Sequence, residues 1–373
     1  MAGAVLPSAF EARFHQNGLN LLRLILALLV ILSHSWHLVP AASDRDQSPI
    51  LESLQIHGGS FAVNLFFAMS GFLLSGSWDR QPRFRDFLVR RVRRIYPGFT
   101  AVCLWQALFA VPLALGGGAA FPALADGWRL GLAMVTLGGA GQMANPQLPL
   151  FPSGVSHDLN ASIWTVRYEF LCYLFLGLLG VIGFWRIRWL RWAVFASAWG
   201  IFLAWPDAEM HPVLTRTVGA WSDWGRLSVY FLGGVIAYWE TGKIPLNRWS
   251  VLVVISALAA SAVGPEAVGR AVGPLILPWL MLHAGYQALP TRVASRLPGD
   301  FSYGIYLYAF PVQQLLLQFT PNVNWTVWGF TLAATGLTLP LAIASWYWVE
   351  ARWLGRGSPH LDAVTPSTHG RHG

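Results

Sequence analysis

The chain has 373 residues, of which 55% are hydrophobic and 11% are charged. This balance excludes an ordinary soluble domain, whose surface needs more charged residues, and it indicates a protein solvated by a lipid bilayer. The net charge of +8 comes almost entirely from arginine, since Lys243 is the single lysine, and the placement of the arginines favours membrane topology over nucleic-acid binding. We expect one all-α polytopic domain over residues 1–354 and a disordered, polar cytoplasmic tail over 355–373.

The first apolar run, Leu24 to Leu32, resembles part of a secretory signal because arginine precedes it and Ala41-Ala42 follows it. The polar residues between His34 and His37 separate this run from any cleavage site. We therefore expect a first span that is retained rather than removed.

Hydropathy predicts ten membrane spans, several of them short. A further stretch, 128–142, is too short and too rich in glycine to cross the bilayer, and we interpret it as a re-entrant or interfacial helix. The ten predicted spans are 20–40, 61–78, 96–115, 161–183, 191–206, 224–240, 249–264, 270–289, 302–320 and 325–349.

Cationic residues mark one side of this predicted membrane. With the N-terminus inside, the outer connections hold few of them, chiefly Arg45, Arg129, Arg216 and Arg270. The positive-inside rule therefore predicts that both termini are cytoplasmic. The inner connections carry many more: Arg80, Arg83, Arg85, Arg90, Arg91, Arg93, Arg94, Arg186, Arg188, Arg191, Lys243, Arg248, Arg292, Arg296, Arg352 and Arg356.

Two ionisable residues lie in the first span. Arg23 and His34 are eleven positions apart, so a helix projects them from one face about 16 Å apart along its axis. They can serve two depths of one cavity, with Arg23 near the cytoplasmic mouth and His34 past the midplane. The alternatives are an arginine that reaches the lipid headgroups and a histidine that bonds a neighbouring carbonyl.

Glu169 ends the motif Asn160-Ala-Ser-Ile-Trp-Thr-Val-Arg-Tyr-Glu. Counted from a span that starts at the outer face, Glu169 has about the same depth as His34, so we expect it to orient the imidazole as a general base. The alternative is an ion pair of Glu169 with Arg167 or Arg226. Trp164 and Asn160 are candidates for binding the substrate, although Trp164 also suits the interfacial aromatic belt.

The predicted cytoplasmic segment Arg90-Arg91-Val92-Arg93-Arg94-Ile95-Tyr96-Pro97 is denser in arginine than orientation alone requires. Guanidinium forks on about two helical turns suit the phosphate oxygens of a nucleotide-containing thioester. Arg90, Arg91, Arg93, Arg94 and Tyr96 are therefore the predicted donor site, and the alternative is a topology signal resting on anionic lipid.

Two further motifs mainly predict packing. In Phe66-Phe67-Ala68-Met69-Ser70-Gly71-Phe72 the small residues permit close helix approach, which we favour over a nucleophilic Ser70. The run from Ser302 to Tyr308 is likewise a packing face, and its phenols, Tyr303 among them, can also line a substrate cavity. No Walker loop, G-x-S-x-G motif or metalloprotease histidine pair occurs in the sequence.

A metal site is not expected. Cys103 and Cys172 lie inside apolar runs, where cysteine behaves as a small hydrophobe. His34 and His37 are one helical turn apart, but no third ligand has a suitable spacing.

Taken together these motifs resemble the acyltransferase 3 family, the membrane O-acyltransferases of lipopolysaccharide O-antigen and exopolysaccharide, over nearly the whole chain. The resemblance implies a ten-span bundle in the bacterial inner membrane that uses acyl-CoA, usually acetyl-CoA, with a glycan or lipid-linked saccharide as acceptor. It also implies that Arg23 and His34 are required for activity and that the arginine-rich segment serves the donor. Where many members have histidine, this chain has Ala309, so no catalytic role is assigned there.

The predicted reaction has two rivals. A transporter or exporter of a lipid-linked glycan would use the same intramembrane polar residues to line a translocation path. A scaffold subunit of a glycan-assembly complex would tolerate substitution of Arg23 and His34. The sequence leaves open the acceptor hydroxyl, the acyl chain and the choice between direct transfer and an acyl-histidine intermediate.

Overall fold

Every regular element in the described part of this computed structural model is a helix, which confirms the all-α prediction. The described residues are 18–39, 58–114, 134–137, 158–206, 219–241, 266–294 and 297–355, together with positions 209, 215, 252 and 256. The longer helices are α2 (Leu19–Leu38), α5 (Gly58–Arg80), α6 (Phe84–Trp105), α10 (Thr165–Val181), α11 (Arg188–Ala204), α13 (Trp221–Trp239), α15 (Glu266–His283), α17 (Ser302–Phe319) and α18 (Val327–Ser345).

Three of these helices continue through a π-helical turn. These turns are η1 (Gln106–Ala110) after α6, η4 (Ala284–Ala288) after α15 and η5 (Trp346–Glu350) after α18. The short elements α7 (Val111–Ala114), α16 (Thr291–Ala294), α19 (Ala351–Trp353) and the 3₁₀ turn η3 (Phe184–Arg186) complete the described set.

Five helical segments are long and apolar enough to cross a membrane, so the chain is an integral membrane protein. Helices α10 and α11 have 17 residues each, at the short end for a span, and the predicted count of ten and the position of the termini remain predictions. Most of the predicted span 249–264, most of the segment 128–142 and the tail beyond residue 355 lie outside the described residues. The five segments are Leu19–Leu38, Gly59–Arg80, Phe84–Ala114, Ala267–Ala288 and Val327–Trp353.

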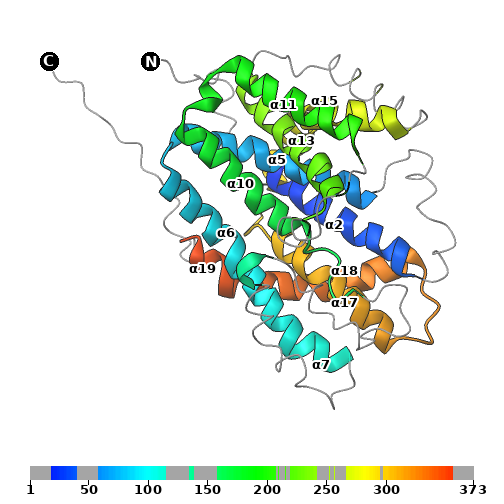
Figure 1. The fold of residues 1–373 in the computed structure, drawn as a ribbon. Coiled ribbons are helices and arrows are strands. Elements are labelled where there is room, and N and C mark those ends of the chain that lie inside the picture. The colour runs from blue at the N-terminus through cyan, green and yellow to red at the C-terminus, as the bar shows by residue number, and fades with distance from the viewer. Residues whose placement is uncertain are drawn as a thin grey trace.

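Helix α2 lies at the centre of the bundle, with α5 and α13 on one side and α17 and α18 on the other (Figure 1). Polar contacts join α2 to α17 inside the bundle. The Gln313 amide donates to the Ile31 carbonyl at 3.0 Å and to the Ser35 hydroxyl at 2.9 Å. Such interhelical hydrogen bonds fix the rotation of packed helices where lipid supplies no alternative partner.

The closest helix pair is α5 with α13, and two glycines make it possible. A Cβ on Gly71 would lie 2.0 Å from the Phe231 carbonyl oxygen, and one on Gly234 would lie 1.9 Å from that of Ala68. Only glycine permits backbones to approach this closely, which confirms the packing role predicted for the segment around Gly71.

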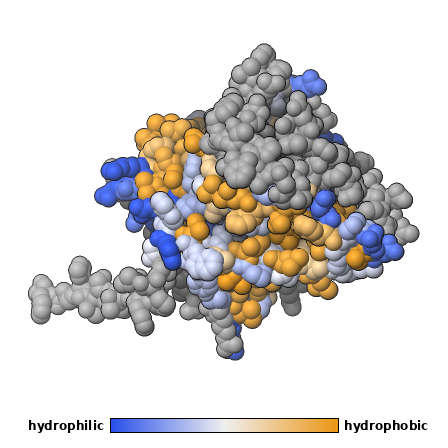
Figure 2. Space-filling model, turned by 90° about the horizontal axis from the view of Figure 1, so that it is seen from below, coloured by the Kyte–Doolittle hydropathy of each residue, from blue (hydrophilic) through white to orange (hydrophobic). Residues whose placement is uncertain are grey.

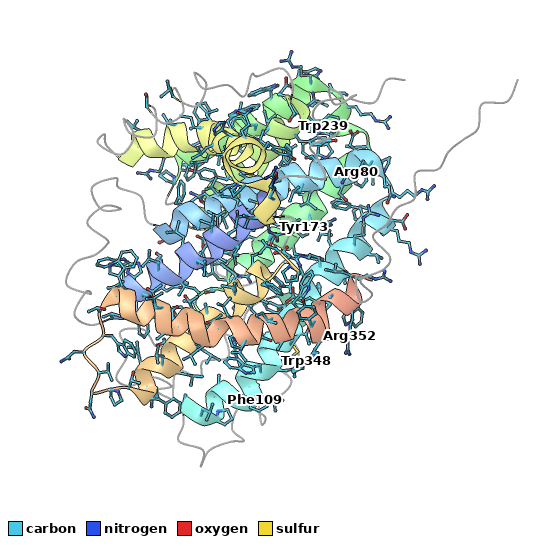
Figure 3. All side chains as sticks on the ribbon, turned by 180° about the vertical axis from the view of Figure 1, so that it is seen from behind. Arg80, Phe109, Tyr173, Trp239, Trp348 and Arg352 are labelled. Carbon is cyan, nitrogen blue, oxygen red and sulfur yellow. The ribbon has the colours of Figure 1, made fainter. Side chains whose placement is uncertain are left out.

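Many large hydrophobic side chains of the described residues are exposed, which suits a surface that faces lipid. Orange, hydrophobic residues cover the centre of the face in Figure 2, and hydrophilic residues gather toward its margins. Large side chains project outward in Figure 3, among them Trp348, which is 69% exposed, and Phe109, which is 56% exposed. In the same view Arg80 and Arg352 lie on one side of the molecule, while Tyr173 points into the interior.

Candidate acyl-transfer site

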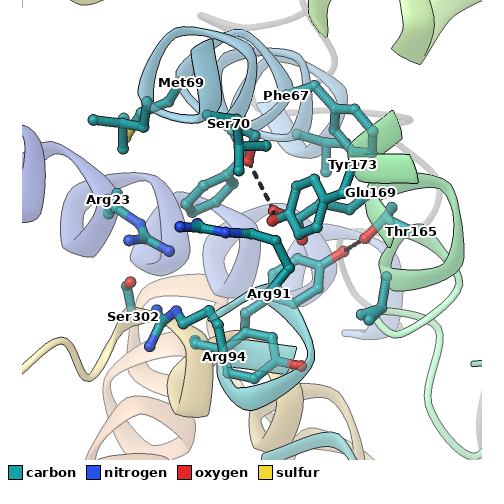
Figure 4. A pocket seen from close by; sticks show the side chains of 17 residues that line it. Arg23, Phe67, Met69, Ser70, Arg91, Arg94, Thr165, Glu169, Tyr173 and Ser302 are labelled. Carbon is teal, nitrogen blue, oxygen red and sulfur yellow. Dashed lines mark hydrogen bonds between the residues drawn. The ribbon is translucent and has the colours of Figure 1, made fainter. Parts of the chain in front are cut away.

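A cavity of about 130 Å³ lies inside the bundle, between α2, α5, α6, α10 and α17 (Figure 4). Along α5 its wall runs from Val63 to Leu74, a rise of about 16 Å, so the cavity is elongated along the helix axes. Its polar lining groups are Arg23, Ser70, Arg91, Arg94, Thr165, Glu169, Tyr173, Ser302, Tyr303 and Tyr306, and its apolar ones are Val63, Phe66, Phe67, Met69, Leu73, Leu74 and Val166.

Three of these residues, Arg23, Arg91 and Arg94, form what we call the arginine end. Arg23 Nη1 and Arg94 Nη2 each lie 2.7 Å from Oδ2 of Asp300, which directly precedes α17. Arg94 Nη1 also lies 3.6 Å from Oε2 of Glu350 in the π-helical turn η5. Burial would raise the pKa of Asp300, but the two guanidinium groups more than offset this and hold that pKa well below its ordinary range.

Arg91 differs from the other two arginines. Within the described residues it forms no ion pair, its Nη2 donates to the Ser77 hydroxyl at 3.3 Å, and its buried Nε has no hydrogen-bond partner. Glu169 interacts with Arg91 electrostatically but forms no ion pair with it, so this largely buried guanidinium keeps donors that suit an anion.

The predicted donor residues therefore divide by helix face. Arg91 and Arg94, three positions apart, line the cavity, whereas Arg90 bonds the Gln81 side chain at 2.7 Å and Arg93 is exposed. Tyr96 also lies off the cavity wall and donates to the Val135 carbonyl at 3.0 Å. Only half of the arginine cluster is placed to contact a ligand in the cavity.

Glu169 faces the cavity from α10 and is held by two hydroxyl groups. The Ser70 hydroxyl donates to Glu169 Oε1 at 2.8 Å, and the Tyr173 hydroxyl donates to the same oxygen (Figure 4). Neither predicted ion pair is observed: Arg226 pairs instead with Asp223 at 3.6 Å and with the Asn64 side chain at 2.9 Å. Gly71 supplies the packing contact of its segment, so the adjacent Ser70 is free to face the cavity.

The predicted contact between Glu169 and His34 is wrong for this structure. A Cβ on Gly59 would lie 3.0 Å from the Ser33 hydroxyl, so the N-terminal end of α5 is level with the His34 region of α2. Ser70 lies eleven residues further along α5, about 16 Å away, and places Glu169 near the level of Arg23. His34 instead packs edge-on against Phe310, with ring centroids 5.0 Å apart, and its buried Nδ1 has no partner within the described residues.

The depth prediction failed because α10 does not begin at the surface. Residues 158–164 enter the bundle as a non-helical segment, and the helix starts only at Thr165, whose hydroxyl lies 2.7 Å from the Tyr306 hydroxyl. Buried non-helical backbone is tolerated at membrane depth when its polar groups are satisfied within the protein. Here the Gln314 amide donates to the Asp158 carbonyl at 2.9 Å.

Asn160 joins this segment to α17. Pro311 has no amide hydrogen, so it leaves the carbonyl of Leu307, four residues earlier, without its helical partner. The Asn160 Nδ2 donates to that carbonyl at 2.8 Å, and its Oδ1 accepts from the Ser162 amide at 3.0 Å. With 2% exposure and both ends of its amide engaged, Asn160 suits a structural joint better than the predicted contact with substrate.

The other two predicted substrate residues, Trp164 and Tyr303, lie in different parts of the bundle. Trp164 is partly exposed beside Tyr168, and the Arg226 guanidinium lies 5.9 Å from its ring centroid. Tyr303 lines the arginine end, where its hydroxyl donates to the Ile95 carbonyl at 3.0 Å and Arg94 lies 5.3 Å from its ring. Tyr303 is thus placed beside the predicted donor site rather than the acceptor side.

Four polar residues of this region escaped the prediction from sequence: Asp300, Glu350, Tyr173 and the inward-facing Ser70. Asp300 and Glu350 carried a usable signal, since a carboxylate beside or inside an apolar span is costly unless it is paired. Tyr173 carried none, because one helical turn after Glu169 it reads as an ordinary aromatic residue. Within the described residues no group of three or more His, Cys, Asp or Glu is arranged to hold a metal ion.

The chain is similar to known acyltransferases over most of its length. Residues 16–347 match the family described as "Acyltransferase domain". The chain is 28% identical over 347 residues to the "O-acetyl transferase" of Shigella phage Sf6, which covers 91% of this chain and 96% of that protein. It is 26% identical over 365 residues to "Nodulation protein 10" of Rhizobium leguminosarum bv. viciae, which covers 92% of this chain and 95% of that protein.

No solved structure shows significant similarity to the chain. The family match spans the cavity, both ends of the predicted site and all of the longer described helices. The chain therefore belongs to the acyltransferase 3 family and is a membrane acyltransferase.

Proposed function

We propose that this protein transfers an acetyl group from cytoplasmic acetyl-CoA to a hydroxyl of a glycan or lipid-linked saccharide on the outer side of the bacterial inner membrane. The observation that carries the proposal is the elongated cavity with three arginines at one end. Such a cavity fits a donor with a charged head and a thin arm. The name of the phage relative supports acetyl as the acyl group.

The arginine end is the proposed donor site. Arg91 offers a guanidinium without a carboxylate partner in the described residues, and Arg23 and Arg94 stand beside it. Arginine forks bind phosphate oxygens with two parallel hydrogen bonds, which suits the phosphates of CoA. The pantetheine arm would follow the cavity, past Glu169 and the hydroxyl groups of Ser70 and Tyr173, toward Val63.

The transfer itself is assigned to His34. Val63 lies one turn along α5 from Gly59, so the far end of the cavity is about 7 Å of helix rise below His34. The neutral imidazole would accept the proton of the sugar hydroxyl as that oxygen attacks the thioester carbonyl. The carbon–sulfur bond then breaks, and the thiolate takes the proton and leaves as CoA. An acyl-histidine intermediate would use the same nitrogen as nucleophile.

The acceptor side is assigned to Trp164, whose partly exposed ring can stack on a sugar face. Glu169 is retained as a site residue in a changed role, because it lies beside the path of the donor arm and three helical turns from His34. Its carboxylate would accept hydrogen bonds from the amides of that arm.

The test is acetyl transfer by purified protein in liposomes, with His34→Ala compared with His37→Ala. His37 lies one turn further along α2 and is exposed, so it controls for the loss of an imidazole from the same helix. Loss of a general base lowers kcat by about 10²–10⁴-fold. We expect that loss in His34→Ala and near-normal kcat in His37→Ala. Wild-type turnover by His34→Ala would reject the assignment, and saccharide flux without release of CoA would reject the proposed reaction.

A further inference from the structure

Asp300 connects three chain segments at the arginine end of the cavity. Its Oδ2 forms ion pairs with Arg23 of α2 and Arg94 of α6, both at 2.7 Å. Its Oδ1 accepts a hydrogen bond from the hydroxyl of Ser302 at the start of α17. The carboxylate is 10% exposed. One buried oxygen therefore sets the separation of two guanidinium groups that reach it from helices far apart in the sequence.

The alternative arrangement of these arginines is visible in their other contacts. Without Asp300, Arg94 keeps its 3.6 Å contact with Glu350 and would turn toward it. Arg23 forms no second ion pair in the described residues, but Glu350 lies close enough to interact with it electrostatically. Without Asp300 its long side chain would turn toward Glu350 or extend to water. Both movements take a guanidinium away from the cavity wall.

We propose that Asp300 is a positioning residue for the acyl donor, holding Arg23 and Arg94 side by side so that a phosphate-bearing thioester meets two fixed forks. The inference rests on the proposed function and adds a residue that the family resemblance did not supply. It requires that the gain in donor binding from the fixed arginines exceeds the loss from repulsion between the Asp300 carboxylate and the phosphates. A carboxylate beside a phosphate site also repels the ligand, so a purely electrostatic role would make removal of its charge improve binding.

The two roles therefore predict opposite changes of KM for acetyl-CoA when the charge of Asp300 is removed. In full-length protein in liposomes, Asp300→Asn keeps the shape of the side chain and removes its charge. We expect KM for acetyl-CoA to rise about ten- to a hundredfold, as for loss of a hydrogen bond to a charged group, with kcat changed much less. Asp300→Glu, which keeps the carboxylate, should recover part of the lost affinity.

Glu240 provides a matched control. It is also a buried carboxylate shared by two arginines, with Arg188 at 3.1 Å and Arg191 at 3.7 Å, and it does not line the cavity. Glu240→Gln should therefore lower thermal stability as much as Asp300→Asn does, yet leave KM for acetyl-CoA unchanged. An equal rise of KM in both variants would reduce Asp300 to a general structural role and overturn the inference.

A second variant keeps the proposal testable if Asp300→Asn does not fold. Ser302→Ala removes the hydroxyl that orients the carboxylate but keeps all charges, and it should raise KM for acetyl-CoA a few-fold with kcat retained. An unchanged or lowered KM in Asp300→Asn, or an unchanged KM in Ser302→Ala, overturns the inference. If the wild-type protein itself transfers nothing from acetyl-CoA, the proposed function fails first, and the two failures are thereby distinguished.

Discussion

Replacing Gly234 by alanine should separate the two most closely packed helices. The new Cβ would lie 1.9 Å from the Ala68 carbonyl oxygen, whereas ordinary contact begins near 3.4 Å, so α5 and α13 must move apart by about 1.5 Å. The obstacle is backbone, so no side chain can turn away to make room. Overpacking of this kind costs about 1–3 kcal/mol. A chain of this length loses roughly 2 °C of melting midpoint per kcal/mol, which predicts a fall of about 2–6 °C.

The two cysteines of the chain supply the assay. Cys103 and Cys172 are both buried, with 0% and 3% exposure, so a thiol-reactive fluorogenic dye labels them only as the bundle opens. Because Ala68 lies two residues from Ser70, displacement of α5 should also break the hydrogen bond from Ser70 to Glu169 and lower acetyl transfer.

Gly336→Ala is the matched control for this substitution. Gly336 lies within α18, and a Cβ there would meet no atom within 4 Å. Its midpoint should be unchanged or slightly raised, because alanine is the better helix former. An unchanged midpoint and activity in Gly234→Ala would refute the claim that direct backbone contact between α5 and α13 holds the cavity wall in place.

The remaining predictions concern the two ends of the cavity. Arg91→Ala should raise KM for acetyl-CoA about tenfold or more, whereas Arg93→Ala, on the exposed face of the same segment, should leave it unchanged; equal effects would favour a topology signal. Glu169→Gln should raise KM but leave the pH dependence of kcat as in the wild type, and an altered pH dependence would restore the contact with His34. The pKa of Asp300 is held low by its two arginines, so the stability it contributes is complete above about pH 4 and is lost as the pH falls through the depressed value. Asp300 therefore stays ionised between pH 8 and pH 5 and should cause no change of KM for acetyl-CoA over that range. The control is the same pH series with Asp300→Asn. A change of KM that occurs in the wild type and is absent from this variant would show that Asp300 titrates in the range and would contradict the prediction.

The predictions from sequence agree best with the structure in the positions of the helices. They agree least in the relative depth of residues on different helices. Each predicted span overlaps a described helix wherever the structure describes the chain, because a long apolar run favours a helix. The bounds differ most at 96–115, since α6 already begins at Phe84. The depth of Glu169 was wrong because it was counted from an assumed surface. The non-helical segment 158–164 descends into the bundle first, and hydropathy does not distinguish it from the start of a helix.

The contrast between Gly71 and Ser70 makes the same point at the level of single residues. A small residue in a span predicts close helix packing, and Gly71 provides it. Whether the Ser70 side chain meets a partner depends on the position of α10, which carries Glu169. The sequence of one segment does not give the position of another helix. The same holds for Asn160, whose function as the partner of a carbonyl freed by Pro311 joins two segments about 150 residues apart.

The amino-acid sequence by itself indicated a helical membrane protein, predicted a cytoplasmic side from its arginines, and singled out Arg23, His34 and the segment Arg90–Arg94 as ionisable residues in or beside spans. These properties follow from composition and from the periodicity of one helix, which are local. The resemblance to the acyltransferase 3 family made the same residues candidates for acyl transfer. Only the tertiary structure decided which arginines face the cavity, which carboxylates hold them, and that Glu169 lies beside Ser70 rather than His34. Those outcomes depend on the depth and rotation of helices packed against one another, and glycine contacts, proline breaks and buried polar pairs set them across long sequence separations.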